Sequence, residues 1–149
     1  MGLTEDLGRG PVGVDTALFI YFIEEHPRFL RLIEPLFAAA DEGKRELVTS
    51  ALTLLEVLVV PFRAGNLALG ERYENLLTQS AGIRIVEVTR DQLRTAAQLR
   101  AATAVRTPDA LQLAAAITSG CTSFITNDRR LPAVAGIRVL QLADYVAAG

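Results

Sequence analysis

The chain has few of the side chains that cross-link a fold or bind soft metal ions. Its 149 residues include one cysteine, Cys121, and one histidine, His26. A single cysteine cannot close an intramolecular disulfide, and this pair cannot complete the tetrahedral cage of a structural zinc ion. The fold must therefore be held by a hydrophobic core, for which the chain is long enough.

Long apolar runs and a secretory signal are also missing. The longest uncharged stretch, residues 110–127, is interrupted by Gln112 and by residues 118–120. It therefore lacks the ~20 predominantly apolar residues that cross a bilayer. The amino terminus carries Glu5 and Asp6 where a signal peptide would carry basic residues. We expect a cytoplasmic protein with no membrane contact.

An excess of basic charge is absent as well. The chain has 15 Lys and Arg against 17 Asp and Glu, for a net charge of −2. The strongly basic balance of many nucleic-acid-binding domains is therefore not present. Lys44 is the only lysine, so nearly all basic residues are arginines, whose planar guanidinium suits phosphate.

Short apolar segments alternate with helical segments along the chain. The chain is 50% hydrophobic and 21% charged, which is typical of a packed globular protein. The alternation predicts an α/β fold with a parallel sheet covered on both faces. The expected strands are 11–14, 46–49, 83–88, 123–126 and 137–140. The expected helices are 16–25, 28–42, 51–63, 67–81, 91–105, 107–119 and a last one reaching Ala148.

The domain organisation is expected to be simple. No internal repeat, low-complexity tract or linker divides the chain. We expect residues 1–10 to be a flexible segment and residues 11–149 to form a single domain.

Four acidic residues occupy unusual places in this pattern. Asp15 and Asp128 follow predicted strands, at the carboxyl edge where open parallel sheets bind ligands. Asp109, near the start of its helix, could reach the same edge. Glu56 lies in an apolar helix with no cation three or four residues away, a costly place for a charge unless it is paired or bound to metal.

Each acid also has a purely structural interpretation. Asp15 and Asp109 could only cap helices, Asp128 could form a turn, and Glu56 could pair with a distant arginine. If the four converge, however, their carboxylates repel one another unless a divalent cation lies between them. In the absence of a His or Cys cluster, oxygen ligation indicates Mg²⁺ or Mn²⁺. Because Mg²⁺ often completes its shell with phosphate oxygens, the implied substrate is a phosphate ester.

At these residues the chain resembles the PIN-domain ribonucleases, specifically the VapC-type toxins of bacterial and archaeal toxin–antitoxin pairs. The resemblance covers nearly everything from Val12 onward. Residues 14–16 look like the family's first acidic motif, and residues 50–57 resemble its S-x-x-T-x-x-E helix. Residues 107–114 and 124–128 are similar to the third and fourth motifs, and the four occur in the family's order.

The resemblance implies a fold, a ligand set and a reaction. The fold would be a PIN-like three-layer α/β/α arrangement with a short parallel sheet of four to five strands. The reaction would be endonucleolytic cleavage of RNA by a metal-activated water. One or two Mg²⁺ or Mn²⁺ ions would be held by Asp15, Glu56, Asp109 and Asp128. Supporting roles would fall to Thr16, Ser50, Thr126 and Asn127, of which Ser50 is expected to cap its helix.

The same resemblance implies an RNA substrate, a cognate antitoxin protein and a homodimer. Arg129 and Arg130, directly after Asp128, are candidates for contacts with RNA phosphates, although they could equally be solvated loop residues. The family's antitoxins dock near the first two helices of the domain, where packing in the core is the alternative for Phe19, Tyr21, Phe22 and Phe29. Gln112 stands where some relatives carry histidine, a departure that affects no proposed ligand.

Two alternatives come from other functional classes. A haloacid-dehalogenase-like phosphatase requires a second Asp two residues after the first, where this chain has Ala17, and a lysine late in the chain, where Lys44 is early. A PIN-like fold retained only as a binding module would be expected to have lost one or more acids, and all four are present.

Overall fold

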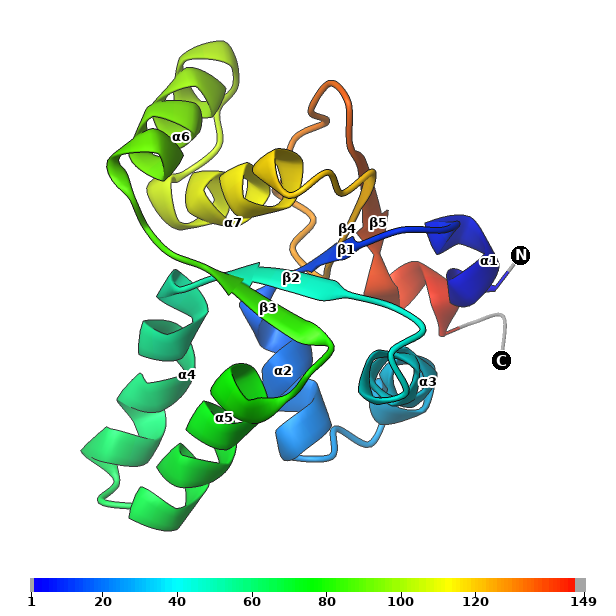
Figure 1. Ribbon diagram of the computed structural model, residues 1–149, viewed down its shortest axis with the longest axis vertical. Helices are drawn as coiled ribbons and strands as arrows, with labels where there is room; N and C mark the ends of the chain where they lie inside the picture. The colour runs from blue at the N-terminus through cyan, green and yellow to red at the C-terminus, as the bar shows by residue number, and fades with distance from the viewer. Residues whose placement is uncertain (1, 147–149) are drawn as a thin grey trace.

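A five-stranded parallel sheet forms the centre of the computed structural model, which describes residues 2–146. The strand order is β3-β2-β1-β4-β5. Helices cover both faces, with α6 and α7 on one side and α2 to α5 on the other (Figure 1). The predicted three-layer α/β/α architecture is therefore confirmed. The strands are β1 (Val12–Val14), β2 (Leu47–Ser50), β3 (Ile83–Val86), β4 (Ser123–Thr126) and β5 (Arg138–Gln141).

The helices follow the predicted order with one addition, at the amino terminus. The expected last helix is a single 3₁₀ turn, η1 (Leu142–Tyr145), and its predicted end at Ala148 lies outside the described residues. Among the described residues, no helix is both long and hydrophobic enough to span a membrane. The α-helices are α1 (Leu3–Leu7), α2 (Thr16–Ile23), α3 (Leu30–Asp41), α4 (Leu52–Arg63), α5 (Leu67–Gln79), α6 (Arg90–Ala102) and α7 (Thr107–Thr118).

The inner strands are buried on both faces, as expected for a parallel sheet between two helical layers. Val12 and Val14 of β1 contact the cluster formed with α2, α3 and α5. Phe124 of β4 faces the opposite cluster, which includes α7. Alternate residues of each strand thus hold the two helical layers at the sheet.

Gly13 allows α7 to approach β1 closely. A Cβ atom at this position would lie 2.7 Å from the Cβ of Ala116 in α7 and 2.7 Å from Cδ1 of Phe124 in β4. No side chain fits there without displacing the helix. The contact fixes the height of α7 above the sheet, and with it the position of residues at the start of that helix.

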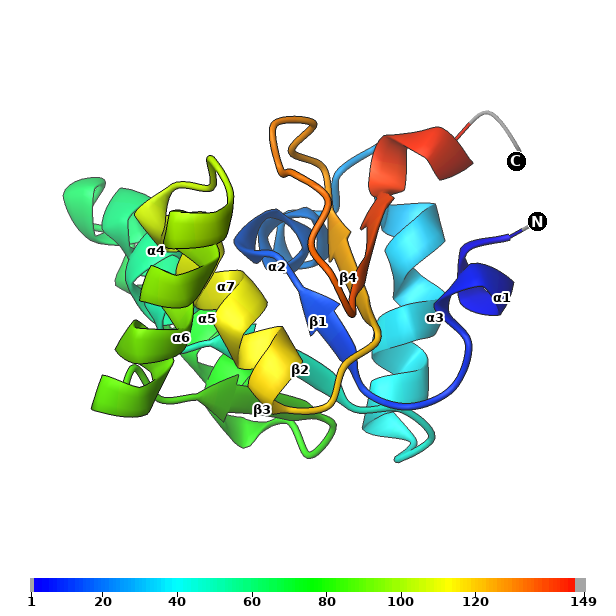
Figure 2. The same cartoon turned by 90° about the horizontal axis from the view of Figure 1, so that it is seen from above.

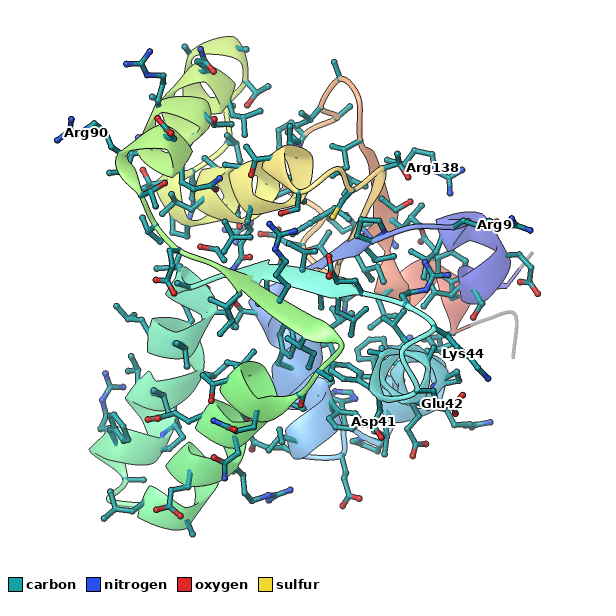
Figure 3. The ribbon with its side chains drawn as sticks, in the orientation of Figure 1. Arg9, Asp41, Glu42, Lys44, Arg90 and Arg138 are labelled. Atoms are coloured by element: carbon teal, nitrogen blue, oxygen red, sulfur yellow. The ribbon has the colours of Figure 1, made fainter. Side chains whose placement is uncertain are left out.

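In the part that the structure describes, the segment over residues 1–10 that we expected to be flexible includes the short helix α1. Leu3 and Leu7, one helical turn apart in α1, are buried in the core. The Tyr145 hydroxyl donates to the Asp6 carboxylate at 2.6 Å. Arg138 extends from β5 on the side where α1 lies and donates to the Asp6 carbonyl (Figure 3). The first and last helical segments of the described chain, α1 and η1, lie on this same side of the molecule (Figure 2).

His26 has a structural role in the turn after α2. Its Nδ1 accepts hydrogen bonds from the backbone N–H groups of Arg28 (3.1 Å) and Phe29 (3.3 Å). It therefore supports the turn between α2 and α3.

Candidate active site

Asp15 joins the carboxyl ends of β1 and β4. It is the N-cap of α2, and its Oδ1 accepts from the backbone N–H of Thr16 at 2.8 Å. Its Oδ2 accepts from the hydroxyl of Thr126, the last residue of β4, at 2.6 Å. The capping role is therefore real, but it occupies one oxygen only, and the second oxygen reaches across to the neighbouring strand.

The Thr126 hydroxyl also positions the loop that carries Asp128. It accepts a hydrogen bond from the backbone N–H of Asp128 at 3.0 Å while donating to Asp15. Thr126 itself is completely buried. One hydroxyl thus fixes two of the predicted acids relative to each other, which is a supporting role of the kind predicted for Thr126.

Glu56 reaches the same edge from α4. It is half-buried, and its Oε1 accepts from the Thr16 hydroxyl at 2.6 Å. The alternative that Glu56 pairs with a distant arginine is not observed among the described residues. Because Thr16 directly follows Asp15, its hydroxyl connects the second predicted acid to the first.

Asp109 lies in the first turn of α7 and completes the group of four acids. Burial raises the pKa of its carboxyl, and the nearby Asp15 and Asp128 raise it further, with a smaller contribution from Glu56. Arg130 opposes these effects. Among residues 2–146, no hydrogen bond reaches the Asp109 carboxylate. Asp15, Glu56 and Asp128 therefore all lie within electrostatic reach of Asp109 at the carboxyl edge of the sheet.

The pKa of Asp15 is raised for related reasons. Burial is the largest cause, and Asp128 adds to it, whereas the hydrogen bonds from Thr126 and Thr16 act in the opposite direction. Asp15 and Asp109 are thus two acids whose ionised forms are disfavoured in the absence of a cation, a property that often marks functional sites.

The acids line one edge without forming a cage around a single point. In the described part of the chain, no three Asp, Glu, His or Cys side chains are arranged to hold one metal ion. The donor chemistry nevertheless fits Mg²⁺, which is usually bound through one or two carboxylates and keeps several waters. Asp109 and Asp15 fit this requirement, since they are adjacent, half-buried carboxylates.

The two arginines after Asp128 form ion pairs within the chain. The guanidinium of Arg130 donates to both Asp128 oxygens, at 3.0 and 3.1 Å, and lowers the pKa of that carboxyl. Arg129 pairs with Asp144. Both arginines are exposed, and exposed ion pairs of this kind are weak.

Asn127 and Ser50 support the backbone around the site. Asn127 donates to the Tyr21 hydroxyl at 3.3 Å and accepts from the backbone N–H of Ala143 at 3.1 Å, so it attaches the loop after β4 to its surroundings. The Ser50 hydroxyl accepts from the N–H of Leu52 at 3.2 Å. The prediction that Ser50 caps this helix is wrong, because α4 begins one residue later than predicted and its N-cap is Ala51, with no side-chain cap. Ser50 instead closes the turn that leads into the helix.

Gln112 is the central polar residue beneath the acids, although no role was predicted for it from the sequence. Its Oε1 accepts from the N–H of Ser50 (3.1 Å) and the hydroxyl of Thr49 (3.2 Å). Its Nε2 donates to the hydroxyls of Thr53 (2.7 Å) and Thr16 (3.2 Å). The signal in the sequence was a single polar residue in the apolar run 110–116, almost one turn after Asp109.

Comparison with known proteins identifies the family. The PIN domain family model matches residues 12–137, so the chain belongs to the PIN domain family. A search of curated proteins finds no match.

Three solved structures share the fold at low sequence identity. A chain of VapBC2 from Rickettsia felis bound to a promoter DNA fragment superimposes with a TM-score of 0.61 at 15% identity, covering 88% of this chain and 98% of that one. A toxin–antitoxin complex from Klebsiella pneumoniae gives 0.63 at 18%, covering 90% and 98%. DNA-bound VapBC from Salmonella typhimurium gives 0.58 at 20%, covering 89% and 98%. The predicted resemblance to the PIN domain is confirmed.

We expect Asp109→Asn to raise the melting temperature of the metal-free protein at neutral pH. The folded-state pKa of Asp109 lies above its unfolded value, so stability is lost as the pH rises through the folded pKa. The gain in the variant should be present at about pH 7 and shrink toward about pH 4, near the unfolded pKa of Asp. Thermal unfolding followed by circular dichroism across this range measures it.

The matched control for this experiment is Asp91→Asn. Asp91 also lies in the first turn of a helix but is exposed and outside the group of four acids, so this variant carries the same loss of helix-dipole interaction. A melting temperature for Asp109→Asn that stays at or below that of Asp91→Asn at every pH would contradict the electrostatic account.

Proposed function

We propose that this PIN-domain protein is a metal-dependent endoribonuclease and the toxin of a toxin–antitoxin pair. The observation that carries the proposal is the meeting of Asp15, Glu56, Asp109 and Asp128 at one sheet edge. They come from β1, α4, α7 and the loop after β4, far apart in sequence. Mutual repulsion and burial make such a group unfavourable unless it binds a cation.

The residues of the chain have separable tasks in this reaction. Asp109 and Asp15 would hold Mg²⁺ or Mn²⁺, with Glu56 and Asp128 completing the negative edge. When bound, the ion supplies an activated water and neutralises charge on the phosphate. The Thr126 hydroxyl keeps Asp15 facing the edge, and the Thr16 hydroxyl does the same for Glu56. Arg129 and Arg130 would bind flanking phosphates of the RNA.

Purified protein should cleave RNA in the presence of Mg²⁺ or Mn²⁺ and lose this activity in EDTA. Asp15→Asn and Asp109→Asn should abolish cleavage, because each removes a carboxylate ligand while preserving side-chain size. Asp91 is an exposed acid on α6, so the Asp91→Asn variant should cleave RNA as the wild type does. Gel analysis of a labelled RNA, with circular dichroism to verify folding, measures the effect. Wild-type cleavage by either site variant would exclude the assignment.

The partner side of the proposal rests on an exposed apolar surface. Large hydrophobic side chains along α4 and at the start of α5 are exposed, and we call them the α4 face. Contiguous apolar patches of this kind mark interaction sites. The members of the α4 face are Leu55 (61% exposed), Val59 (39%), Val60 (65%), Phe62 (54%) and Leu67 (69%).

The aromatic residues of the first two helices are less available. Phe19 and Phe29 are buried, and Phe22 stacks on Phe37 with ring centroids 4.1 Å apart. The core-packing interpretation therefore holds for Phe19 and Phe29. The surface open to a protein partner is the α4 face.

We assign the α4 face to the cognate antitoxin rather than to a second copy of the chain. The three solved structures compared above are VapBC or toxin–antitoxin complexes. In addition, the face belongs to the helix that carries Glu56, and Leu55 and Val59 flank that residue in the helix. A protein seated there stands beside the acidic edge, where it can block access of RNA.

Val60→Asp should weaken binding of the protein encoded next to this one by more than about tenfold, because it buries a charge in an apolar contact. Leu93→Asp is the matched control, since Leu93 is also an exposed apolar residue (51%) but lies on α6. Calorimetric titration measures the affinity. If Val60→Asp leaves this affinity unchanged and instead converts a dimer into a monomer in light scattering, the α4 face is the homodimer interface.

A further inference from the structure

A buried polar cluster lies directly beneath the acidic edge. Gln112 is 2% exposed, Thr49 is 1% exposed and Thr53 is completely buried. The cluster joins the end of β2, the first turn of α4 and the middle of α7. Such a group is tolerated inside a protein only when its donors and acceptors are paired. Here both the oxygen and the nitrogen of the Gln112 amide have two partners each.

The orientation of the Gln112 amide is fixed by the backbone. The N–H of Ser50 can only donate, so the Gln112 atom 3.1 Å from it must be the oxygen. The amide nitrogen then faces the hydroxyls of Thr53 and Thr16. The two N–H groups of Gln112 are therefore committed to these hydroxyls.

The proton positions of the threonines follow from this orientation. Glu56, as a carboxylate, can only accept, so Thr16 donates to it and accepts from Gln112. Thr49 donates to the Gln112 oxygen, so Thr53 donates to Thr49 at 2.7 Å. In this assignment each hydroxyl proton is used once.

The alternative partner of the Thr16 hydroxyl is close. Its oxygen lies 3.1 Å from that of Thr53, so without the Gln112 amide its proton could turn toward Thr53 and leave Glu56. Gln112 also follows Asp109 by three residues in α7 and attaches this helix to the backbone of Ser50. One side chain thus influences the placement of two of the four acids.

We propose that Gln112 is a positioning residue of the nuclease site, which directs the Thr16 hydroxyl onto Glu56 and holds α7 at the depth that brings Asp109 to the edge. This inference rests on the proposed function. Gln112 contacts neither the substrate nor an acid directly, and it acts through Thr16 and the α7 backbone.

The test compares Gln112→Met with Gln92→Met. Gln92 is also buried (8% exposed) and donates to Thr118 at 2.7 Å, at the opposite end of α7 from Asp109. Both variants remove a buried amide of similar size, so both should lower the melting temperature. Only Gln112→Met should reduce kcat for RNA cleavage, by about tenfold to a hundredfold as for other groups that orient metal ligands, with KM for RNA unchanged. Its Mn²⁺ affinity, measured by calorimetry, should fall as well.

A double-mutant cycle with Thr16→Val tests the route through the hydroxyl. If Gln112 acts through Thr16, the double variant should lose little more activity than Thr16→Val alone. Thr16→Ser, which keeps the hydroxyl, should retain activity and Mn²⁺ affinity. This pair of Thr16 variants keeps the proposal testable even if Gln112→Met does not fold.

Two results would overturn the proposal. One is wild-type kcat and Mn²⁺ affinity in folded Gln112→Met, and the other is full additivity with Thr16→Val. Failure of the proposed function looks different: the wild type then does not cleave RNA, or Asp15→Asn cleaves as well as the wild type does. In that case the Mn²⁺ affinities of the Gln112 and Thr16 variants still decide whether Gln112 positions the acids.

Discussion

Repulsion among carboxylates that the fold forces together is the constraint around which this domain is built. Asp15 and Asp109 have raised pKa values because burial and neighbouring acids both disfavour their ionised forms. The rest of the molecule offsets the repulsion between these carboxylates. Two hydrophobic layers enclose the parallel sheet and hold its carboxyl edge in place. The close contact at Gly13, which sets the height of α7 on the sheet, is part of this arrangement. A divalent cation is the partner that would remove the repulsion.

Hydroxyl groups determine where each carboxylate points. Thr126 donates to Asp15, and Thr16 donates to Glu56. Thr126 is the last residue of β4, and Thr16 is the first residue of α2, two residues after the end of β1. Asp128 is restrained differently, by the guanidinium of Arg130 two residues away. Asp109 receives no hydrogen bond among the described residues. Among the described residues, the acids therefore range from firmly oriented by hydrogen bonds, as in Asp15, to not hydrogen-bonded at all, as in Asp109.

Much of this could be predicted from the sequence, because it depends on local patterns. The alternation of strands and helices predicts the α/β fold. The positions of Asp15 and Asp128 after predicted strands mark them as candidate site residues. Other features depend on contacts between distant residues. To predict the burial of Leu3 and Leu7, one must know what α1 packs against. The role of Gln112 depends on four hydrogen-bond partners that are distant in sequence. The nearest of them, Thr53, is 59 residues away. Whether Arg130 pairs with Asp128, and which apolar residues stay exposed on α4, likewise follows only from the assembled structure.

Diffraction from crystals grown with Mn²⁺, recorded at the manganese absorption edge, tests the central claim most directly. The account predicts an anomalous peak at the carboxyl edge of the sheet, about 2 Å from an oxygen of Asp109 and coordinated by Asp15 or another of the four acids. A fully occupied ion elsewhere on the protein, with this edge bearing no anomalous signal, would contradict it.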